Sequence, residues 1–150
     1  MQLHSSSTSV QTSARAGAAM PQCILIVEDE DVLARNLKTF LERSACDVRT
    51  AADGEQAIRM LDSFRPDALV VDYALPGIDG VRTFVEIARR QAGRIDCVMI
   101  TGSPSERLLD LARGCGIRHL VCKPFSFAEL QQLLEDPRSA GGGDAPEAGL

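Results

Sequence analysis

The sequence predicts an α/β fold in which a parallel β-sheet carries helices on both faces. Short apolar runs alternate with helix-length amphipathic segments, a pattern typical of buried parallel strands joined by helical crossovers. Four of these runs are Cys23–Val27, Ala68–Val71, Cys97–Ile100 and His119–Cys122. A chain of 150 residues is long enough for one such domain and too short for two.

The residue pattern in the first half of the chain predicts two strand–helix units. A strand at about 23–28 precedes a helix over about 32–44, and a second strand follows at 47–51. The apolar stripe of that first helix consists of Leu33, Leu37, Phe40 and Leu41. Asp53 and Gln56 then have the spacing of a capping box, which predicts the start of a second helix.

The middle of the chain predicts two more strands with a helix between them. The third strand runs to Asp72, and a third helix starts near Asp79. The inward face of this helix consists of Val81, Phe84, Val85 and Ala88. A fourth strand is expected at 95–100.

Two further helix starts frame the fifth strand. The run Ser103-Pro104-Ser105-Glu106 places an N-cap, a proline and an acid at the first, second and fourth positions of a helix start. That helix is expected to end at Gly114 or Gly116. The fifth strand is expected at 118–122, and Ser126 with Glu129 caps a last helix over about 127–135.

Composition and charge restrict the class of protein. The net charge of −5 gives little support to direct nucleic-acid binding through a basic face. No apolar run has the length of a membrane span, and residues 1–20 lack the apolar core of a secretory signal, so we expect a cytoplasmic protein. Residues 1–20 and 137–150 are poor in large apolar side chains, so they are expected to be disordered and to contribute nothing to the core.

The cysteines indicate a reducing compartment. There are five, which is an odd number, and no two have the Cys-x-x-Cys spacing of a zinc site. Cys23, Cys97 and Cys122 lie inside apolar strand runs, where cysteine is expected to act as a small buried hydrophobe.

Polar side chains follow the apolar runs at the points where these end. Glu28 and Asp29 follow the first strand, Asp72 ends the third, Thr101 follows the fourth and Lys123 follows the fifth. Because ligands bind at the carboxyl ends of the strands in an open parallel sheet, we expect these groups to converge at one edge.

Three carboxylates in one place favour a divalent cation. Like charges raise one another's pKa unless a cation offsets them, and Mg²⁺ is usually held by one or two carboxylates, water and substrate phosphate. The alternative is that residues 28–31 are only an acidic helix start, stabilised by the helix dipole. The presence of Asp72 and Lys123 at the same edge favours the metal site.

Asp72, Lys123 and Thr101 are suited to phosphoryl transfer. A carboxylate can attack phosphorus to give an aspartyl-phosphate, and helix capping explains Asp79 better than Asp72. Of the sixteen basic residues only Lys38 and Lys123 are lysines, and a lysine at a strand end can reach a phosphate or a carboxylate. Thr101 could offer its hydroxyl to a phosphoryl oxygen, or could simply be a β-branched residue that finishes a strand.

Four segments resemble the receiver domain of two-component response regulators. They are Ile24–Asp31, Val71–Gly80, Ile100–Gly102 and Lys123–Phe125. The resemblance implies a flavodoxin-like, doubly wound sheet of five parallel strands in the order 2-1-3-4-5, with five helices. It also implies a receiver domain over residues 21–136 and a cis peptide between Lys123 and Pro124.

The resemblance further implies how the site works. Asp72 would take a phosphoryl group from a sensor histidine kinase or a histidine phosphotransfer protein. Asp29, Asp72 and the carbonyl of Ala74 would ligate Mg²⁺, with Glu28 acting through water. Lys123 would bind a phosphoryl oxygen.

Two positions depart from the usual receiver pattern. Thr101 would sense the phosphoryl group, but the aromatic switch residue expected three positions before Lys123 is replaced by Leu120. We therefore expect Leu120 to repack apolar surface instead of flipping a ring. Ala74, two positions after Asp72, has no side chain that could order an attacking water, which leaves the lifetime of the phosphoryl group open.

The sequence thus predicts a stand-alone receiver that signals to an unknown effector in a phosphorelay, with no output domain in residues 137–150. It is not expected to be an enzyme beyond accepting a phosphoryl group and slowly losing it. One alternative is a Mg²⁺-dependent phosphohydrolase with an aspartyl-phosphate, although Ala74 stands where such an enzyme would carry a second acid. Another is a pseudo-receiver that binds without phosphorylation, which predicts loss of the acids or of Lys123.

Overall fold

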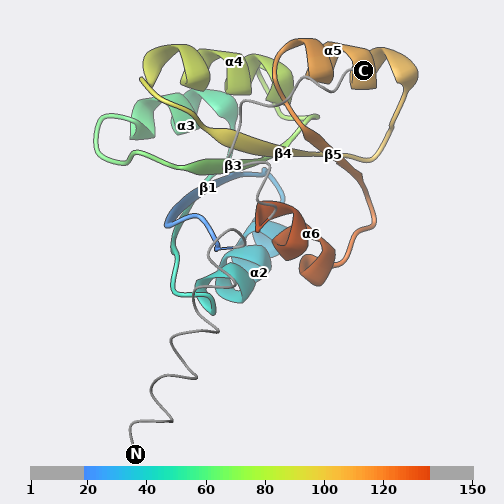
Figure 1. Ribbon diagram of the computed structural model, residues 1–150. Coiled ribbons are helices and arrows are strands. Elements are labelled where there is room, and N and C mark those ends of the chain that lie inside the picture. Colours follow the sequence, from blue (N-terminus) through green and yellow to red (C-terminus); the bar gives the residue numbers. More distant parts are fainter. Residues whose placement is uncertain (1–18, 136–150) are drawn as a thin grey trace, which may run out of the picture.

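The computed structural model describes residues 19–135, which form a five-stranded parallel sheet between two layers of helices (Figure 1). In chain order the elements are β1 (Cys23–Val27), α2 (Asp31–Glu42), β2 (Asp47–Ala51), α3 (Gly54–Met60), β3 (Ala68–Asp72), α4 (Gly80–Arg90), β4 (Asp96–Thr101), α5 (Glu106–Gly114), β5 (His119–Cys122) and α6 (Phe127–Leu134). The sheet order β2-β1-β3-β4-β5 confirms the predicted fold class.

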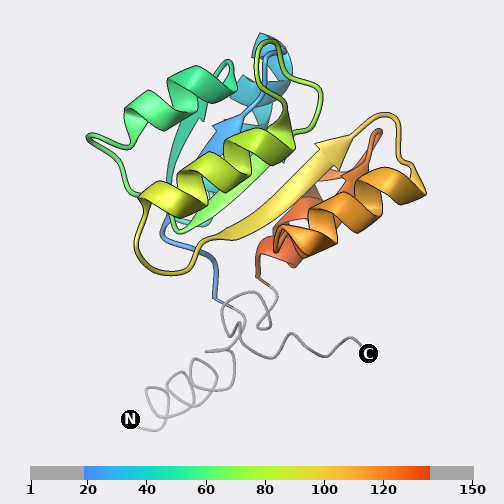
Figure 2. The same ribbon diagram turned by 90° about the horizontal axis from the view of Figure 1, so that it is seen from above.

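The helices divide between the two faces of the sheet. In Figure 1, α3, α4 and α5 cover the upper face, while α2 and α6 cover the lower face. Figure 2, seen from above, shows α4 lying between α3 and α5. This division follows from right-handed crossovers that start at β1 and wind in both directions along the sheet.

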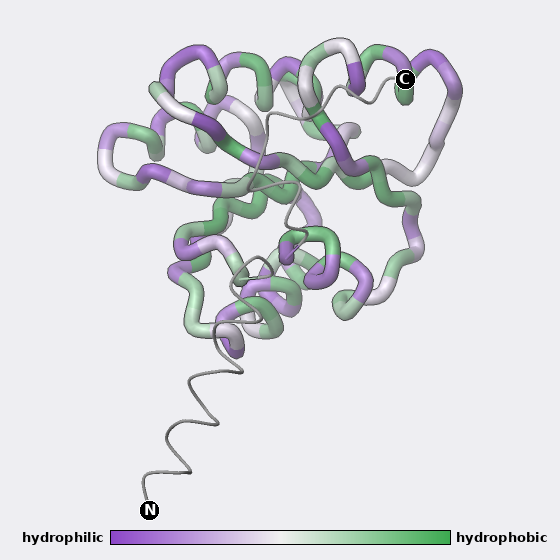
Figure 3. Tube along the Cα trace, viewed as in Figure 1, coloured by the Kyte–Doolittle hydropathy of each residue, from purple (hydrophilic) through white to green (hydrophobic). Residues whose placement is uncertain are grey.

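The core consists of two layers, one on each face of the sheet. Successive residues of a strand point to opposite faces, so Leu25 and Val27 belong to the upper layer while Ile24 and Ile26 belong to the lower. All four are fully buried. Figure 3 shows the hydrophobic strands running between helices whose outer surfaces are more hydrophilic. Parallel strands covered on both faces read as continuous apolar runs, as observed here.

Side-chain caps fix where the helices begin. Asp53, Asp79 and Ser126 accept hydrogen bonds from the backbone N–H groups three residues later, as the sequence predicts. The predicted cap at Ser103 is wrong. The N-cap of α5 is Ser105, and the N–H of Ser103 instead donates to Thr101 Oγ1 at 3.0 Å, because this residue closes the turn that leaves β4.

Other boundaries differ by one or two residues. Helix α2 ends at Glu42, earlier than predicted, and the chain turns through Ala45, whose φ of 64° lies in the left-handed region. The tails assigned to 1–20 and 137–150 lie outside the described residues, except for residues 19 and 20. There Met20 is half-buried and packs against the lower layer, so the expectation that residues 1–20 contribute nothing to the core is wrong for Met20.

The prediction for the strand cysteines holds for one of three. Cys97 is buried, Cys23 is half-buried and Cys122 is exposed. Cys122 is the last residue of β5, which lies at the edge of the sheet, and its side chain is exposed there. None of the helices within residues 19–135 is long and apolar enough to cross a membrane.

Candidate functional site

The strand ends bring the predicted polar residues to one edge of the sheet. Glu28 follows β1, Asp72 ends β3, Thr101 ends β4 and Lys123 follows β5, and these four strands are consecutive neighbours in the sheet. Carboxylate oxygens of Glu28, Asp29 and Asp72 lie within 4.8 Å of one another. The expected convergence is therefore present in the structure.

Two of the three carboxylates are buried. Glu28 and Asp72 are each 4% exposed, whereas Asp29 is exposed. Glu28 Oε2 accepts a hydrogen bond from the N–H of Glu30 at 3.0 Å, but Glu28 Oε1 is buried and has no hydrogen-bond partner among the described residues. Burial, and then the charge of Asp72, raise the pKa of Glu28 to about 7, although the N–H of Glu30 and the charge of Lys123 act against this.

Lys123 provides the positive charge of the site. Its Nζ donates to Asp72 Oδ2 at 3.0 Å and lies 3.7 Å from Glu28 Oε1 and 3.6 Å from Glu30 Oε1. Burial by itself lowers the pKa of Lys123, but the hydrogen bond to Asp72 and the surrounding carboxylates outweigh it, so that the pKa is raised. The peptide bond between Lys123 and Pro124 is cis, as predicted.

Glu30 is a member of this cluster that the sequence did not predict. It belongs to the acidic start of α2, where a solvated charge is the ordinary interpretation, and its side chain is 65% exposed. Its position two residues after Glu28 could have indicated that it lies near the site. Only the folded chain shows that Lys123 reaches it across the sheet edge.

Asp72 is oriented by its own loop. The N–H of Ala74 donates to Asp72 Oδ1 at 3.1 Å, so both oxygens of this carboxylate have donors. The loop closes where the N–H of Gly80 donates to the carbonyl of Tyr73 at 2.8 Å. A Cβ atom at Gly80 would lie 2.5 Å from the carbonyl oxygen of Asp72, so only glycine allows α4 to start this close to β3.

Thr101 lies at the end of β4, beside the acidic cluster. Among the described residues, its hydroxyl makes no hydrogen bond to that cluster. It is 2% exposed, and its Oγ1 accepts from the N–H of Ser103. Its carbonyl oxygen accepts from the backbone N–H of Lys123 at 2.8 Å, which ties the ends of β4 and β5 together. Ala74 is exposed two residues after Asp72 and contributes only a methyl group there.

The donor set fits a hard divalent cation. Three ionised carboxylates and one ammonium sum to −2, and all the oxygen ligands are of the type that Mg²⁺ prefers. Glu28 Oε1 is a second indication, because this buried oxygen accepts no hydrogen bond among the described residues and Lys123 Nζ, at 3.7 Å, is too far away to donate one. The residues present therefore fit Mg²⁺.

The family model of the response regulator receiver domain matches residues 24–135. The chain belongs to this family. It is thus a receiver domain of a response regulator in two-component signalling. The strand order and the cis peptide bond are those that the resemblance of the sequence to this family implied.

Several relatives are similar over most of the domain. The transcriptional regulatory protein PdtaR of Mycobacterium tuberculosis is 31% identical over 121 residues, which cover 80% of this chain and 58% of that protein. The alkaline phosphatase synthesis transcriptional regulatory protein PhoP of Bacillus subtilis is 35% identical over 116 residues, covering 77% of this chain and 48% of that protein. The chain spans about half the length of these curated relatives.

A solved structure supports the fold independently. The CheY-like response regulator receiver domain protein from Methanospirillum hungatei superposes with a TM-score of 0.71, covering 80% of this chain and 98% of the other. At 21% identity this similarity shows the fold alone.

Proposed function

We propose that this receiver accepts a phosphoryl group on Asp72 from a phosphohistidine of a sensor histidine kinase or a histidine phosphotransfer protein. The observation that carries the proposal is the 3.0 Å contact between Lys123 Nζ and Asp72 Oδ2 within the acidic cluster. An ammonium that already rests on the acceptor carboxylate is positioned to bind an oxygen of the group that arrives there.

The transfer step follows from the orientation of Asp72. A carboxylate oxygen attacks phosphorus, and the new P–O bond forms as the P–N bond of the donor breaks. The imidazole nitrogen of the donor keeps the bonding electron pair and takes up a proton. The hydrogen bond from Ala74 and the contact of Gly80 with the backbone of Asp72 hold the carboxylate in one orientation, so little ordering remains to be done in the transition state.

Mg²⁺ is the cofactor that we propose for this step. Asp29, Asp72 and the backbone carbonyl of Ala74 would hold it, with Glu28 acting through water. When bound, the ion supplies positive charge that offsets the carboxylates and the phosphoryl oxygens. The excess of negative charge at the site supports this assignment.

Thr101 is proposed to report the phosphoryl group to the surface. Its hydroxyl now accepts from the N–H of Ser103, and turning toward a phosphoryl oxygen would release that N–H in the loop before α5. Leu120, half-buried against the upper core layer, would repack beside it. The signal would then reach an effector through apolar surface, without an aromatic side chain at this position.

An aspartyl-phosphate hydrolase is less well supported. Such an enzyme needs an acid or base beside the phosphoryl group to activate water, and Ala74 supplies neither. A pseudo-receiver is also less well supported, because Glu28, Asp29, Asp72 and Lys123 are all present and lie together.

The test is phosphorylation by a small phosphodonor. The protein is incubated with acetyl phosphate and Mg²⁺, and intact-mass spectrometry should show one acid-stable, base-labile phosphate per chain. Asp72→Ala should show none, while the matched control Asp62→Ala, which removes an exposed aspartate after α3, should be labelled like the parent. Full labelling of Asp72→Ala would assign the phosphate to another residue.

Metal binding can be followed separately. The chain has one tyrosine and no tryptophan, and Tyr73 lies next to Asp72, so its fluorescence reports on the site. Titration with MgCl₂ should change the emission in a saturable manner, and Asp29→Asn should weaken the response at least tenfold. Equal responses of parent and variant would remove Asp29 from the ligand set.

A further inference from the structure

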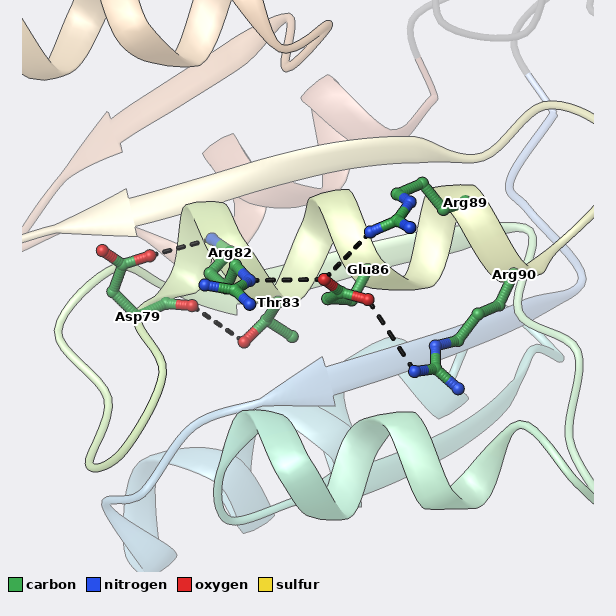
Figure 4. Close-up of polar contacts among 6 residues, drawn as sticks. All are labelled: Asp79, Arg82, Thr83, Glu86, Arg89 and Arg90. Carbon is green, nitrogen blue, oxygen red and sulfur yellow. Dashed lines mark hydrogen bonds and ion pairs between the residues drawn. The ribbon is translucent and has the colours of Figure 1, made fainter.

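The outer surface of α4 carries three arginines around one glutamate. Glu86 Oε2 accepts from Arg82 Nε at 3.3 Å and from Arg89 Nη1 at 3.2 Å, and Glu86 Oε1 lies 3.8 Å from Arg90 Nη2 (Figure 4). The glutamate side chain is 16% exposed, whereas the arginine side chains are 57–69% exposed. We call Arg82, Arg89 and Arg90 the arginine surface.

Helix stability accounts for only part of this arrangement, because Arg89 and Arg90 lie in the last turn of α4, where the helix dipole favours positive charge. Ion pairs three or four residues apart also stabilise a helix, and one partner for each charge is sufficient. On α2 the pairs are one to one, with Arg35 on Asp31 and Lys38 on Glu42. On α4 three guanidinium groups share one carboxylate, which leaves this surface with a charge of +2, from three positive charges and one negative charge.

The shared carboxylate gathers the three guanidinium groups on one face of α4 through two hydrogen bonds and one ion pair. Each guanidinium has five N–H donors, and Glu86 accepts from only a small part of them. The remaining donors face solvent, because more than half of each arginine side chain is exposed. Long side chains that are already ordered lose less entropy when they bind a partner. The array is therefore suited to bidentate recognition of carboxylates.

The charge of this surface is opposite to that of the whole chain. The chain has a net charge of −5, so most of its surface repels an acidic partner. The positive array attracts such a partner and would therefore direct it to this helix. From Arg82 to Arg90 the helix rises about 12 Å, since each residue adds about 1.5 Å. Two or three carboxylates along one helical face or one extended segment span the same length.

We propose that the arginine surface of α4 is a docking site for an acidic segment of another protein. A segment with two or three Asp or Glu side chains spread over about 12 Å would match both the length and the charge of the array. A nucleic acid fits less well, because its continuous line of phosphates would lie against a chain of net charge −5 with only three arginines to offset it.

The surface lies on an element that also touches the phosphoacceptor strand. The first residue of α4, Gly80, rests on the backbone of Asp72 and Tyr73, and the arginines follow along the same helix. A partner bound there is thus in contact with a helix whose start depends on the position of Asp72. The binding proposal itself does not depend on phosphorylation, so it can be tested apart from the proposed function.

The test uses a defined acidic probe on the full chain. A fluorescein-labelled decaglutamate peptide is titrated in 50 mM NaCl and followed by fluorescence anisotropy. The parent should bind with an affinity that falls as salt rises, and Arg89→Gln/Arg90→Gln should bind at least tenfold more weakly. Arg89→Lys/Arg90→Lys, which keeps the charge but loses the bidentate fork, should lose less. Melting temperatures show whether each variant is folded.

The matched control lies on the neighbouring helix of the same layer. Arg107→Gln/Arg113→Gln removes the same charge from α5, where Arg107 and Arg113 are likewise exposed, and should bind like the parent. Equal loss in both double variants, or no binding by the parent, would overturn the proposal. Tighter binding of a single-stranded RNA decamer or of anionic vesicles with the same dependence on Arg89 and Arg90 would also overturn it. So would self-association of the parent that the Arg89→Gln/Arg90→Gln variant abolishes, since a second copy would then occupy the surface.

Discussion

Lys123 and Asp72 are 51 residues apart in the sequence, and their side chains meet at 3.0 Å across the edge of the sheet. Asp72 is buried and lies beside Glu28, so the lysine is the cation that offsets two buried carboxylates. This pairing makes the site sensitive to loss of a single positive charge.

Lys123→Met should lower the free energy of unfolding by about 2 kcal/mol in the absence of Mg²⁺, because it leaves buried carboxylates without their cation. The measurement is urea unfolding in EDTA. The control is Lys38→Met, since the only other lysine pairs with the exposed Glu42 at 2.6 Å and should cost less than about 0.5 kcal/mol. Equal losses would show that Lys123 does not offset the buried charge.

Asp29→Asn should raise the melting temperature of the metal-free protein by about 3 °C, because it removes one of three carboxylates that repel one another. The parent should gain stability when Mg²⁺ is added, and the variant should gain little or none. Differential scanning fluorimetry in EDTA and in 10 mM MgCl₂ measures both effects. A variant that still gains as much as the parent would contradict the metal assignment.

Gly80→Ala should destabilise the protein by about 2 kcal/mol and reduce phosphorylation of Asp72. The added Cβ would meet the backbone of Asp72 and Tyr73, which cannot move aside as a flexible side chain would. Thermal unfolding and acetyl phosphate labelling provide the two readouts. Gly114→Ala is the control, because a Cβ at this last residue of α5 meets nothing within 4 Å and should be neutral or stabilise by up to about 1 kcal/mol.

Thiol reagents should distinguish Cys122 from Cys97. Cys122 is exposed on the edge strand, so it should supply the fast phase of labelling by a disulfide reagent, and Cys122→Ser should remove that phase. Burial, and then the charge of Asp96, raise the pKa of Cys97 above its ordinary value of 9.0, so Cys97 should stay unlabelled in the folded protein at pH 8.

Because the pKa of Cys97 is raised in the folded protein, the free energy of unfolding should fall at alkaline pH. Above about pH 9 the unfolded chain loses the Cys97 proton while the folded protein keeps it, so the folded state binds more protons and its stability falls as the pH rises. The contribution of Cys97 is fully present below pH 9. Cys97→Ala should therefore flatten the alkaline limb of a plot of unfolding free energy against pH, and an unchanged limb would contradict this origin.

Most of the fold could be predicted because local signals agree with one another. Strand β3 reads as a continuous apolar run since all five of its residues are buried, and Asp53 and Ser126 begin helices because their side chains accept from nearby N–H groups. At α5 two serines compete for the same role. Ser105 takes it because Ser103 is used in the turn after Thr101, which depends on a contact that the sequence does not display.

The site was predictable to the extent that strand ends determine it. Glu28, Asp72 and Lys123 each follow an apolar run, and a parallel sheet brings such ends together. The exposure of Cys122 and the contact of Lys123 with Glu30 were not predictable in this way. The contact with Glu30 depends on how far one side chain reaches, and the exposure of Cys122 depends on how the helices cover the end of the edge strand; neither property has a local signal in the sequence.

The position of β5 has a consequence for the order in which the protein is made. Glu28 and Asp29 follow β1 and Asp72 ends β3, and all three are synthesised long before Lys123. A nascent chain that has formed the first four strands therefore carries an uncompensated negative charge at its catalytic edge until the last strand is synthesised and docks. The proposed Mg²⁺ ion would offset the negative charge of this edge during that interval, before Lys123 reaches it.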